Sequence, residues 1–342
     1  MAHNQRIFYA CQAVAITGRG GTLAAANIVK GLQSVGMSSS FTLDQVFEMG
    51  QLGIYENIEE VADIEVTLEK VIDGNKLIYN HASGGECKTS LAGSSKVRSD
   101  VYVAVYDDGL DNATGTPRTV CMNSGMYVSS VSYNYSVDSS ATESVTLVGN
   151  DRFWNVGHGV VSDPTGRWGA GAITNSVFDG TDTPPSGVVR RTNVKLGSGG
   201  SAIPLEVNAQ KGDDTDASLY PNTSNRHIQS ITVSTDFGQE NIQELGRFGP
   251  YHRYATFPIE VTCEFEVVAT SGDLVNVSGN APNLGAGEQI TIKDDAGTIL
   301  NLGAANKLSS VSYSGGDTGG GNATVSYSYS NFNNLLVDDS TA

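Results

Sequence analysis

The sequence predicts a mainly β protein of two tandem β-sandwich or barrel domains, each with a short flanking α-helix. Of its 342 residues, 17% are charged, 39% are apolar and 40 are glycines, a balance typical of turn-rich β proteins. Several segments alternate apolar and polar residues, as strands with one buried face do. One block occurs twice, and the length also favours two domains.

The repeated block indicates an internal duplication. Residues 34–56, SVGMSSSFTLDQVFEMGQLGIYE, align without a gap with 230–252, SITVSTDFGQENIQELGRFGPYH. The signature positions are Phe41, Glu48, Gly50, Gly53 and Tyr55 in the first copy, and Phe237, Glu244, Gly246, Gly249 and Tyr251 in the second. Ile-Glu-Val-Thr recurs at 64–67 and 259–262, and Ser-Ser-Val-Ser-Tyr begins at 129 and at 309. Three blocks in one order predict domains at 1–155 and 187–342, with a Gly/Pro-rich linker or surface excursion at 156–186.

Each copy is expected to begin with a strand and to continue into a short helix. KGLQSVGMSSSF and RHIQSITVSTDF alternate in the strand manner. Thr42 then precedes LDQVFEM, with Gln45 completing a capping box and Gly50 supplying a left-handed stop. In the second copy QENIQEL ends at Gly246 in the same way. These signals predict one helix packed beside each sheet.

The later segments of each copy read as further strands. DIEVTLEKVI places Ile64, Val66 and Leu68 on one face, and PIEVTCEFEVV alternates in the same manner. DVYVAVYDDG, GMYVSSVSYNYSV and ESVTLVGND add three strands, and QITIKDDAG is the second copy's counterpart of the first of these. Each domain is therefore predicted to be a sandwich or barrel of antiparallel strands.

The sequence carries no enzyme motif, and we expect neither catalysis, nor a metal, nor a cofactor. The five histidines and four cysteines are scattered without metal-ligand spacing. KGDDTDAS at 211–218 lacks the glycine and the glutamate of a calcium loop. TGRGGT at 17–22 lacks the Lys-Ser/Thr of a phosphate loop and reads as a glycine turn, whose Arg19 is expected to meet a partner's carboxylate.

Charge and hydropathy restrict the environment and the partners. The formal net charge of −17 argues against a protein that grips nucleic acid by neutralising phosphates, although DNA could slide past such a surface. No apolar run is long enough to span a membrane, and the N-terminus does not read as a secretory signal, so a soluble protein made in a cytoplasm is expected. Tyrosines on the strands are explained by core packing, or by a sugar-binding or subunit-contact face.

A repeated domain without catalytic groups suggests assembly, and the residues support a family resemblance. The block from 34 to 74, followed by GMYVSSVSYNYSVDSSATESVTLVGND, resembles the tail tube protein of long-tailed bacteriophages. The resemblance implies ring domains that stack around a passage for the genome, and a two-domain chain implies trimeric rings with pseudo-sixfold symmetry. It also implies an acidic and neutral lumen through which DNA passes without specific binding.

The resemblance places ring stacking in an extended loop, and residues 73–100 are its best candidate. The predicted inter-ring or inter-subunit contacts are Asp73, Lys76, Tyr79, Lys88, Lys96, Arg98 and Arg19. The expected partners are further copies of the chain and other tail proteins such as a sheath, terminator or baseplate, in a virion tail assembled in the host cytoplasm. The alternatives are a β-sandwich adhesin or carbohydrate-binding protein, a carbohydrate-active enzyme, and a baseplate or terminator ring that does not polymerise.

Overall fold

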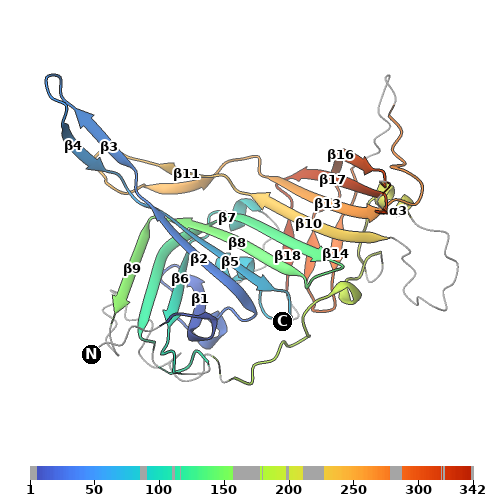
Figure 1. Ribbon diagram of the computed structural model, residues 1–342, viewed down its shortest axis with the longest axis horizontal. Coiled ribbons are helices and arrows are strands. Elements are labelled where there is room, and N and C mark those ends of the chain that lie inside the picture. Colours follow the sequence, from blue (N-terminus) through green and yellow to red (C-terminus); the bar gives the residue numbers. More distant parts are fainter. Residues whose placement is uncertain are drawn as a thin grey trace.

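The chain folds around one large antiparallel sheet, which confirms the mainly β class (Figure 1). The computed structural model describes residues 6–84, 91–109, 112–115, 117–156, 178, 180–197, 200–210, 227–277, 287–316, 318 and 320–339. Most of the predicted linker at 156–186, the predicted contact residue Lys88 and the segment at 211–218 lie outside these ranges.

Eight strands form the main path of the sheet. In spatial order they are β16 (Lys307–Ser314), β17 (Thr324–Phe332), β13 (Glu260–Val268), β10 (Ile228–Asp236), β7 (Thr119–Ser136), β8 (Thr142–Gly149), β5 (Asp63–Val71) and β2 (Leu32–Ser40). The first four come from the second half of the chain and the last four from the first half. β7 and β10 pair directly, so one continuous sheet joins the two halves.

The long strand β7 also belongs to a second layer. Its first part pairs with β6 (Ser99–Val105) and β9 (Asp151–Val156), and β6 pairs with β1 (Gln12–Gly18). Helix α1 (Ile78–Ala82) is buried along its whole length, and α2 (Leu91–Ser94) and α3 (Leu205–Ala209) are the other α-helices of the described residues. A small sheet of β14 (Thr291–Lys293), β15 (Ile299–Asn301) and β18 (Leu336–Asp338) lies in the second half.

One hydrophobic core extends through both halves. It takes Val66 and Leu147 from the first half, Val261 and Tyr329 from the second, and Ile78 from α1. A separate, smaller cluster packs on the sheet of β1, β6 and β7 around Tyr102 and Tyr106. The alternating strands therefore bury the faces that their sequences predict.

The two halves of the large sheet repeat the same strand order. The order β7-β8-β5-β2 in the first half is matched by β16-β17-β13-β10 in the second. The ladders are interrupted by one extra residue at matching places: Gln33 in β2 and Gln229 in β10, and Ser129 in β7 and Ser309 in β16. This correspondence agrees with the predicted duplication, while the domain boundaries themselves stay a prediction.

The ladders correct one part of the sequence alignment. Ser39 of β2 pairs with Ile64, and Thr235, its counterpart in β10, pairs with Val261. Ile64 therefore corresponds to Val261, two residues beyond the Ile259 with which the Ile-Glu-Val-Thr match had aligned it. A displacement of two residues keeps every side chain on the same face, because strand side chains alternate with a period of two.

The two predicted flanking helices are wrong, because both segments form β-hairpins. Residues 43–49 contribute β3 (Leu43–Phe47), which pairs with β4 (Ile54–Glu59), and the second copy contributes β11 (Gln239–Ile242) and β12 (His252–Ala255). Gly50 and Gly246 do have positive φ, of 109° and 84°, but each lies between two strands and not at the end of a helix. A segment of seven residues forms too few helical hydrogen bonds to be stable without a surface that covers it.

Candidate assembly surfaces

The large sheet has a polar face on which serine and threonine predominate. Ser132, Ser234 and Thr262 are typical, since they are direct neighbours on β7, β10 and β13. The carboxylates of this face are those of Asp63, Glu65, Glu69, Asp236, Glu260, Glu264 and Glu266. Among the described residues of the eight strands, Lys307 is the one basic side chain on this face. The face is therefore acidic and neutral, as the lumen implied by the resemblance would be.

The pairing of β7 with β10 makes a closed junction between the halves. Seven residues of β10 pair in continuous register with β7, from Ser230 opposite Ser136 to Asp236 opposite Ser130. The backbone N–H of Phe237 extends the ladder by donating to the Ser129 carbonyl at 2.8 Å. The two strands are paired along the whole length of this seam, so the seam behaves as the interior of a sheet.

The same two kinds of strand occur again as open edges. Within the described part of the chain, β2 pairs with β5 alone and β16 pairs with β17 alone. β2 corresponds to β10, and β16 corresponds to β7, in the repeated strand order. Each edge therefore has the strand type that the other would need as its partner.

Side-chain burial separates the closed junction from the open edges. Tyr133 of β7 is fully buried, while its counterpart Tyr313 in β16 is 52% exposed. Phe237, which follows β10, is fully buried and stacks on Tyr79 at 6.4 Å, while its counterpart Phe41 is 68% exposed. Core packing accounts for seven other tyrosines on or next to the strands, which are all buried: Tyr102, Tyr106, Tyr127, Tyr133, Tyr135, Tyr327 and Tyr329. Exposed aromatic side chains at open strand edges are typical of contact surfaces.

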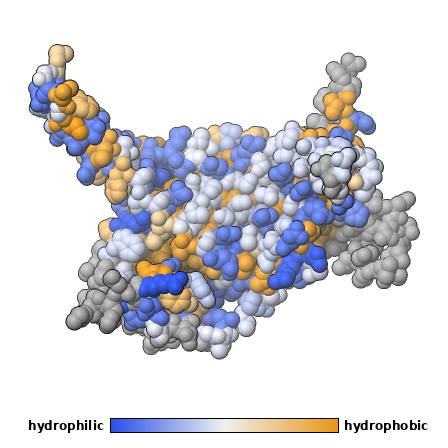
Figure 2. Space-filling model, viewed as in Figure 1, coloured by the Kyte–Doolittle hydropathy of each residue, from blue (hydrophilic) through white to orange (hydrophobic). Residues whose placement is uncertain are grey.

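The β3–β4 hairpin projects from the end of the sheet as a separate arm (Figure 1). Figure 2 shows hydrophobic and hydrophilic side chains mixed along this arm. Its exposed apolar residues are Leu43, Val46, Phe47, Met49, Leu52, Ile54, Tyr55 and Ile58. Its charged residues are all acidic: Asp44, Glu48, Glu56 and Glu59. An arm with this much exposed apolar surface is expected to have a partner.

The β11–β12 hairpin is instead anchored on the first half of its own chain. His252 Nδ1 lies 2.7 Å from the Tyr127 hydroxyl, and the Arg253 guanidinium lies 2.6 Å from the Asp63 carboxylate. Burial and the nearby Arg98 lower the pKa of His252, which favours the neutral imidazole beside the tyrosine. The base of the β3–β4 hairpin and the loop that leads into β12 line one open pocket of about 590 Å³.

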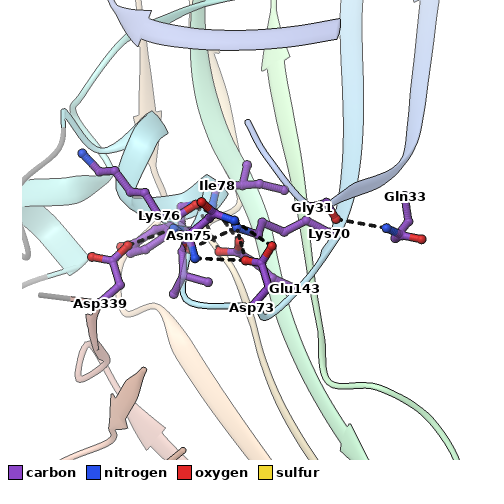
Figure 3. Close-up of polar contacts among 11 residues, drawn as sticks. Gly31, Gln33, Lys70, Asp73, Asn75, Lys76, Ile78, Glu143 and Asp339 are labelled. Carbon is purple, nitrogen blue, oxygen red and sulfur yellow. Dashed lines mark hydrogen bonds and ion pairs between the residues drawn. The ribbon is translucent and has the colours of Figure 1, made fainter. Parts of the chain in front are cut away.

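A buried polar cluster lies under the first half of the sheet (Figure 3). Lys70 of β5 and Glu143 of β8 are opposite each other in the ladder, and both are fully buried. Glu143 accepts hydrogen bonds from the backbone N–H of Ile78 at 2.6 Å and of Tyr79 at 3.1 Å, and from the Tyr133 hydroxyl at 3.0 Å. Burial raises the pKa of Glu143, and the positive charge of Lys70 opposes this effect.

The same cluster fixes the segment that leads into α1. Lys70 Nζ donates to the carbonyls of Asn75 at 3.1 Å and Lys76 at 2.9 Å, and lies 3.4 Å from Asp73. Asp339, near the end of the described chain, accepts the Leu77 N–H at 2.8 Å. These contacts bind the segment to the body, so it is not a projecting loop.

The residues predicted to make intermolecular contacts are thus divided. Asp73 and Tyr79 are buried within their own chain, where neither is presented to a neighbour. Lys76 and Arg98 are half-buried, and Lys96 and Arg19 are exposed. Contacts through these four, and through Lys88, stay a prediction.

The structure presents other contact residues that sequence reasoning missed. They are candidates only by exposure and position: Glu56 on β4 and Lys307 on β16. The exact repeat of Phe41 as Phe237 was a signal for this surface, but only the pairing of β7 with β10 shows what the second copy contacts.

Neither a metal site nor a membrane segment is found in the described residues. Within them, no group of three or more His, Cys, Asp or Glu side chains is arranged to hold a metal ion. None of the helices there is long and apolar enough to cross a bilayer. Cys11, Cys121 and Cys263 are buried free thiols, as expected for structural cysteines.

No family model matches the sequence, and no curated protein matches it. Among solved structures, a chain of the sheath–tube complex of an extracellular contractile injection system (PVC) aligns with 45% of this chain and 95% of its own length, at 13% identity and a TM-score of 0.34. A chain of the anti-feeding prophage cap aligns with 46% of this chain and 95% of its own length, at 14% identity and a TM-score of 0.33. A chain of the PVC sheath/tube terminator aligns with 45% of this chain and 100% of its own length, at 15% identity and a TM-score of 0.32. Structural similarity at these scores does not support a functional assignment, so the function has to be inferred from the structure of the chain itself.

Proposed function

We propose that this chain is the tube subunit of a phage-like tail, and that three copies close a ring with pseudo-sixfold symmetry. The observation that carries the proposal is the match between the closed junction and the open edges. The junction joins β7 of one four-strand unit to β10 of the next, and the open edges are the counterparts of these strands. Repeating the same pairing between copies, β16 with β2, satisfies both edges and closes the sheet into a ring.

The internal junction also supplies the register of the proposed contact. Ser234 is opposite Ser132 in the junction, and their counterparts are Ser38 and Ser312. Val233 is opposite Tyr133, and their counterparts are Met37 and Tyr313. In the ring, Met37 of one copy would therefore cover Tyr313 of the next, which removes both side chains from water.

The polar face supports the same function. When the sheet closes, one face lines the passage, and the face that is not packed on the core carries carboxylates and hydroxyl groups. A wall of this kind repels phosphates and offers them few cations, so DNA passes without being held. Stacked rings would form the tube of a virion tail, with a sheath or terminator and a baseplate as further partners and the host cytoplasm as the place of assembly.

Electron microscopy of the purified protein, with end-on views classified by rotational symmetry, tests the proposal. Hollow tubes with threefold rings are the expected result. Rings that close and never stack would favour a terminator or baseplate component. Protein that stays monomeric at high concentration would contradict the proposal, and binding to a glycan array would then favour the adhesin.

A pair of cysteines tests the register directly. In a Cys87→Ser background, the combination Ser38→Cys with Ser312→Cys is expected to give disulfide-linked trimers on mild oxidation, because directly opposite residues bring their Cβ atoms to about 5 Å. Non-reducing electrophoresis measures the product. The control, Ser34→Cys with Ser312→Cys, is displaced by four residues and should remain monomeric on the gel. Equal crosslinking of both pairs would contradict the register.

A further inference from the structure

The two hairpins have the same internal pairing, although only one of them is docked. Val46 is opposite Glu56 in β3–β4, and Ile242 is opposite His252 in β11–β12. Leu43 opposite Glu59 matches Gln239 opposite Ala255 in the same way. Position by position, His252 therefore corresponds to Glu56.

The docked hairpin shows how such an arm sits on a neighbouring four-strand unit. His252 contacts Tyr127, which begins the part of β7 that pairs with β8. Gln239 Nε2 donates to the Val128 carbonyl at 3.0 Å, and Phe237 packs below on Tyr79. The second half thus places its hairpin base across the rim of the first half, immediately beyond the closed junction.

The open edge offers the same rim, with a different residue at the contact position. Tyr127 is opposite Val148 in the ladder of β7 and β8, and the corresponding pair in β16 and β17 is Lys307 opposite Ser330. Lys307 therefore stands where Tyr127 stands in the closed junction. Lys307 is exposed at this rim. Burial raises the pKa of the nearby Glu288, and the positive charge of Lys307 opposes this effect.

We propose that the β3–β4 hairpin docks on the β16 rim of a second copy of this chain, where Glu56 pairs with Lys307 and Phe41 is buried. This inference rests on the proposed ring and adds to it the residues that join one copy to the next. The neutral pair of His252 with Tyr127 in the closed junction is replaced by an acid and a base at the corresponding positions. Charge complementarity and continuity with the internal junction both identify the occupant as a second copy.

The neighbouring positions are consistent with the same docking. The docked Arg253 contacts Asp63, and the counterparts of these residues are Asn57 on the free hairpin and Glu260 on the other rim. An amide can donate a hydrogen bond to that carboxylate, so the corresponding contact keeps a hydrogen bond where the docked hairpin has an ion pair. The charged residues of the arm are all acidic and the subunit has a net charge of −17, so Lys307, the one basic side chain on the polar face of the eight described strands, is the cation that would select the docking position.

Charge reversal with a rescue tests the pair. Glu56→Lys and Lys307→Glu should each raise the protein concentration needed for half-maximal ring formation by about tenfold, since each places like charges in contact. The double variant, Glu56→Lys with Lys307→Glu, should return the concentration close to that of the wild type. Analytical ultracentrifugation measures the assembled fraction, and circular dichroism checks that each variant is folded.

The matched control is Glu59→Lys, which makes the same change on the same strand at a position whose counterpart, Ala255, has no side chain capable of an ion pair. Effects of equal size for Glu59→Lys and Glu56→Lys, or no recovery in the double variant, would overturn the docking. If the wild-type protein forms rings in the same experiment, the proposed function is not contradicted. Wild-type protein that forms no rings at any concentration would overturn both. A difference between Glu56→Lys and wild type that disappears in high salt would support the ion pair.

Discussion

The first and second halves of the large sheet share a strand order and differ at matched positions. Lys70 and Glu143 are opposite each other in the first half, and the counterparts in the second half are Val267 and Val325, which are equally buried. One half therefore holds its sheet with two buried charged residues, of which Glu143 is hydrogen-bonded to α1, and the other with apolar packing. The comparison shows that the same strand pairing can form with charged or with apolar residues at this position. The buried charges are therefore needed to hold the segment that they bind, residues 75–79, and not to pair the strands.

The largest expected effect comes from breaking the buried pair. Glu143→Val should lower the free energy of unfolding by about 3–5 kcal/mol, because it leaves the backbone N–H groups of Ile78 and Tyr79 and the Tyr133 hydroxyl buried without their acceptor. Lys70→Val should cost a similar amount, and the double variant should cost clearly less than the sum of the two. Urea unfolding of the unassembled chain measures these differences. The control is the pair Val267→Ala and Val325→Ala in the second half, whose coupling should be smaller because neither residue carries a charge.

The two matched phenylalanines sharpen the comparison between the closed and the open seam. Phe237→Ala should destabilise the isolated chain by about 3 kcal/mol, since it removes a fully buried ring. Phe41→Ala should change the stability of the isolated chain by about 0.5 kcal/mol or less, and should instead impair ring formation. Urea unfolding and sedimentation distinguish these results. A stable Phe41→Ala protein that assembles like the wild type would show that Phe41 stays exposed in the ring.

The third effect is the pH dependence of the first half. Burial, with Lys76 and Lys70 nearby, lowers the pKa of His81 to about 3, from an ordinary value of 6.5. The unfolded chain therefore binds a proton that the folded chain does not, so this group removes stability as the pH falls from 6.5 toward 3, by about 1.4 kcal/mol per pH unit. Glu143 has the opposite sign, because its raised pKa favours the folded state as the pH falls through the window just above 4.5.

His81→Gln isolates the histidine contribution. Between pH 6.5 and 3, the slope of the unfolding free energy against pH should be smaller in the variant by the contribution of one proton, about 1.4 kcal/mol per pH unit. Denaturant titrations at several pH values measure this slope. Hydrogen exchange should show the loss of protection at low pH in the first half before the second. An unchanged slope in the variant would mean that His81 titrates normally in the folded chain.

The sequence predicted the strands well because alternation is a local property. SVGMSSS and DIEVTLEKV became β2 and β5, and their repeats became β10 and β13. The helix after Thr42 failed although its capping box and glycine were present, since Leu43 to Phe47 pair with β4. Local signals did not reveal that the partner strand follows directly after the turn.

The candidate site was only partly predictable for a related reason. The repeat of Phe41 and Tyr55 was visible in the sequence, whereas residues 75–79, near the start of the contact loop proposed at 73–100, are held inside the chain by Lys70 and Glu143. The sequence around Lys307 gave no signal of its proposed role. That role depends on the ladder position of Lys307 in β16, which corresponds to that of Tyr127 in β7.

The sequence by itself determined the β class, the alternating faces and the existence of a repeat, because these follow from residue types at short range. The tertiary structure alone decided that β7 joins β10, that β2 and β16 remain open, and that Lys70 faces Glu143. Those pairings join strands that lie far apart along the chain, and their register depends on the packing of a shared core.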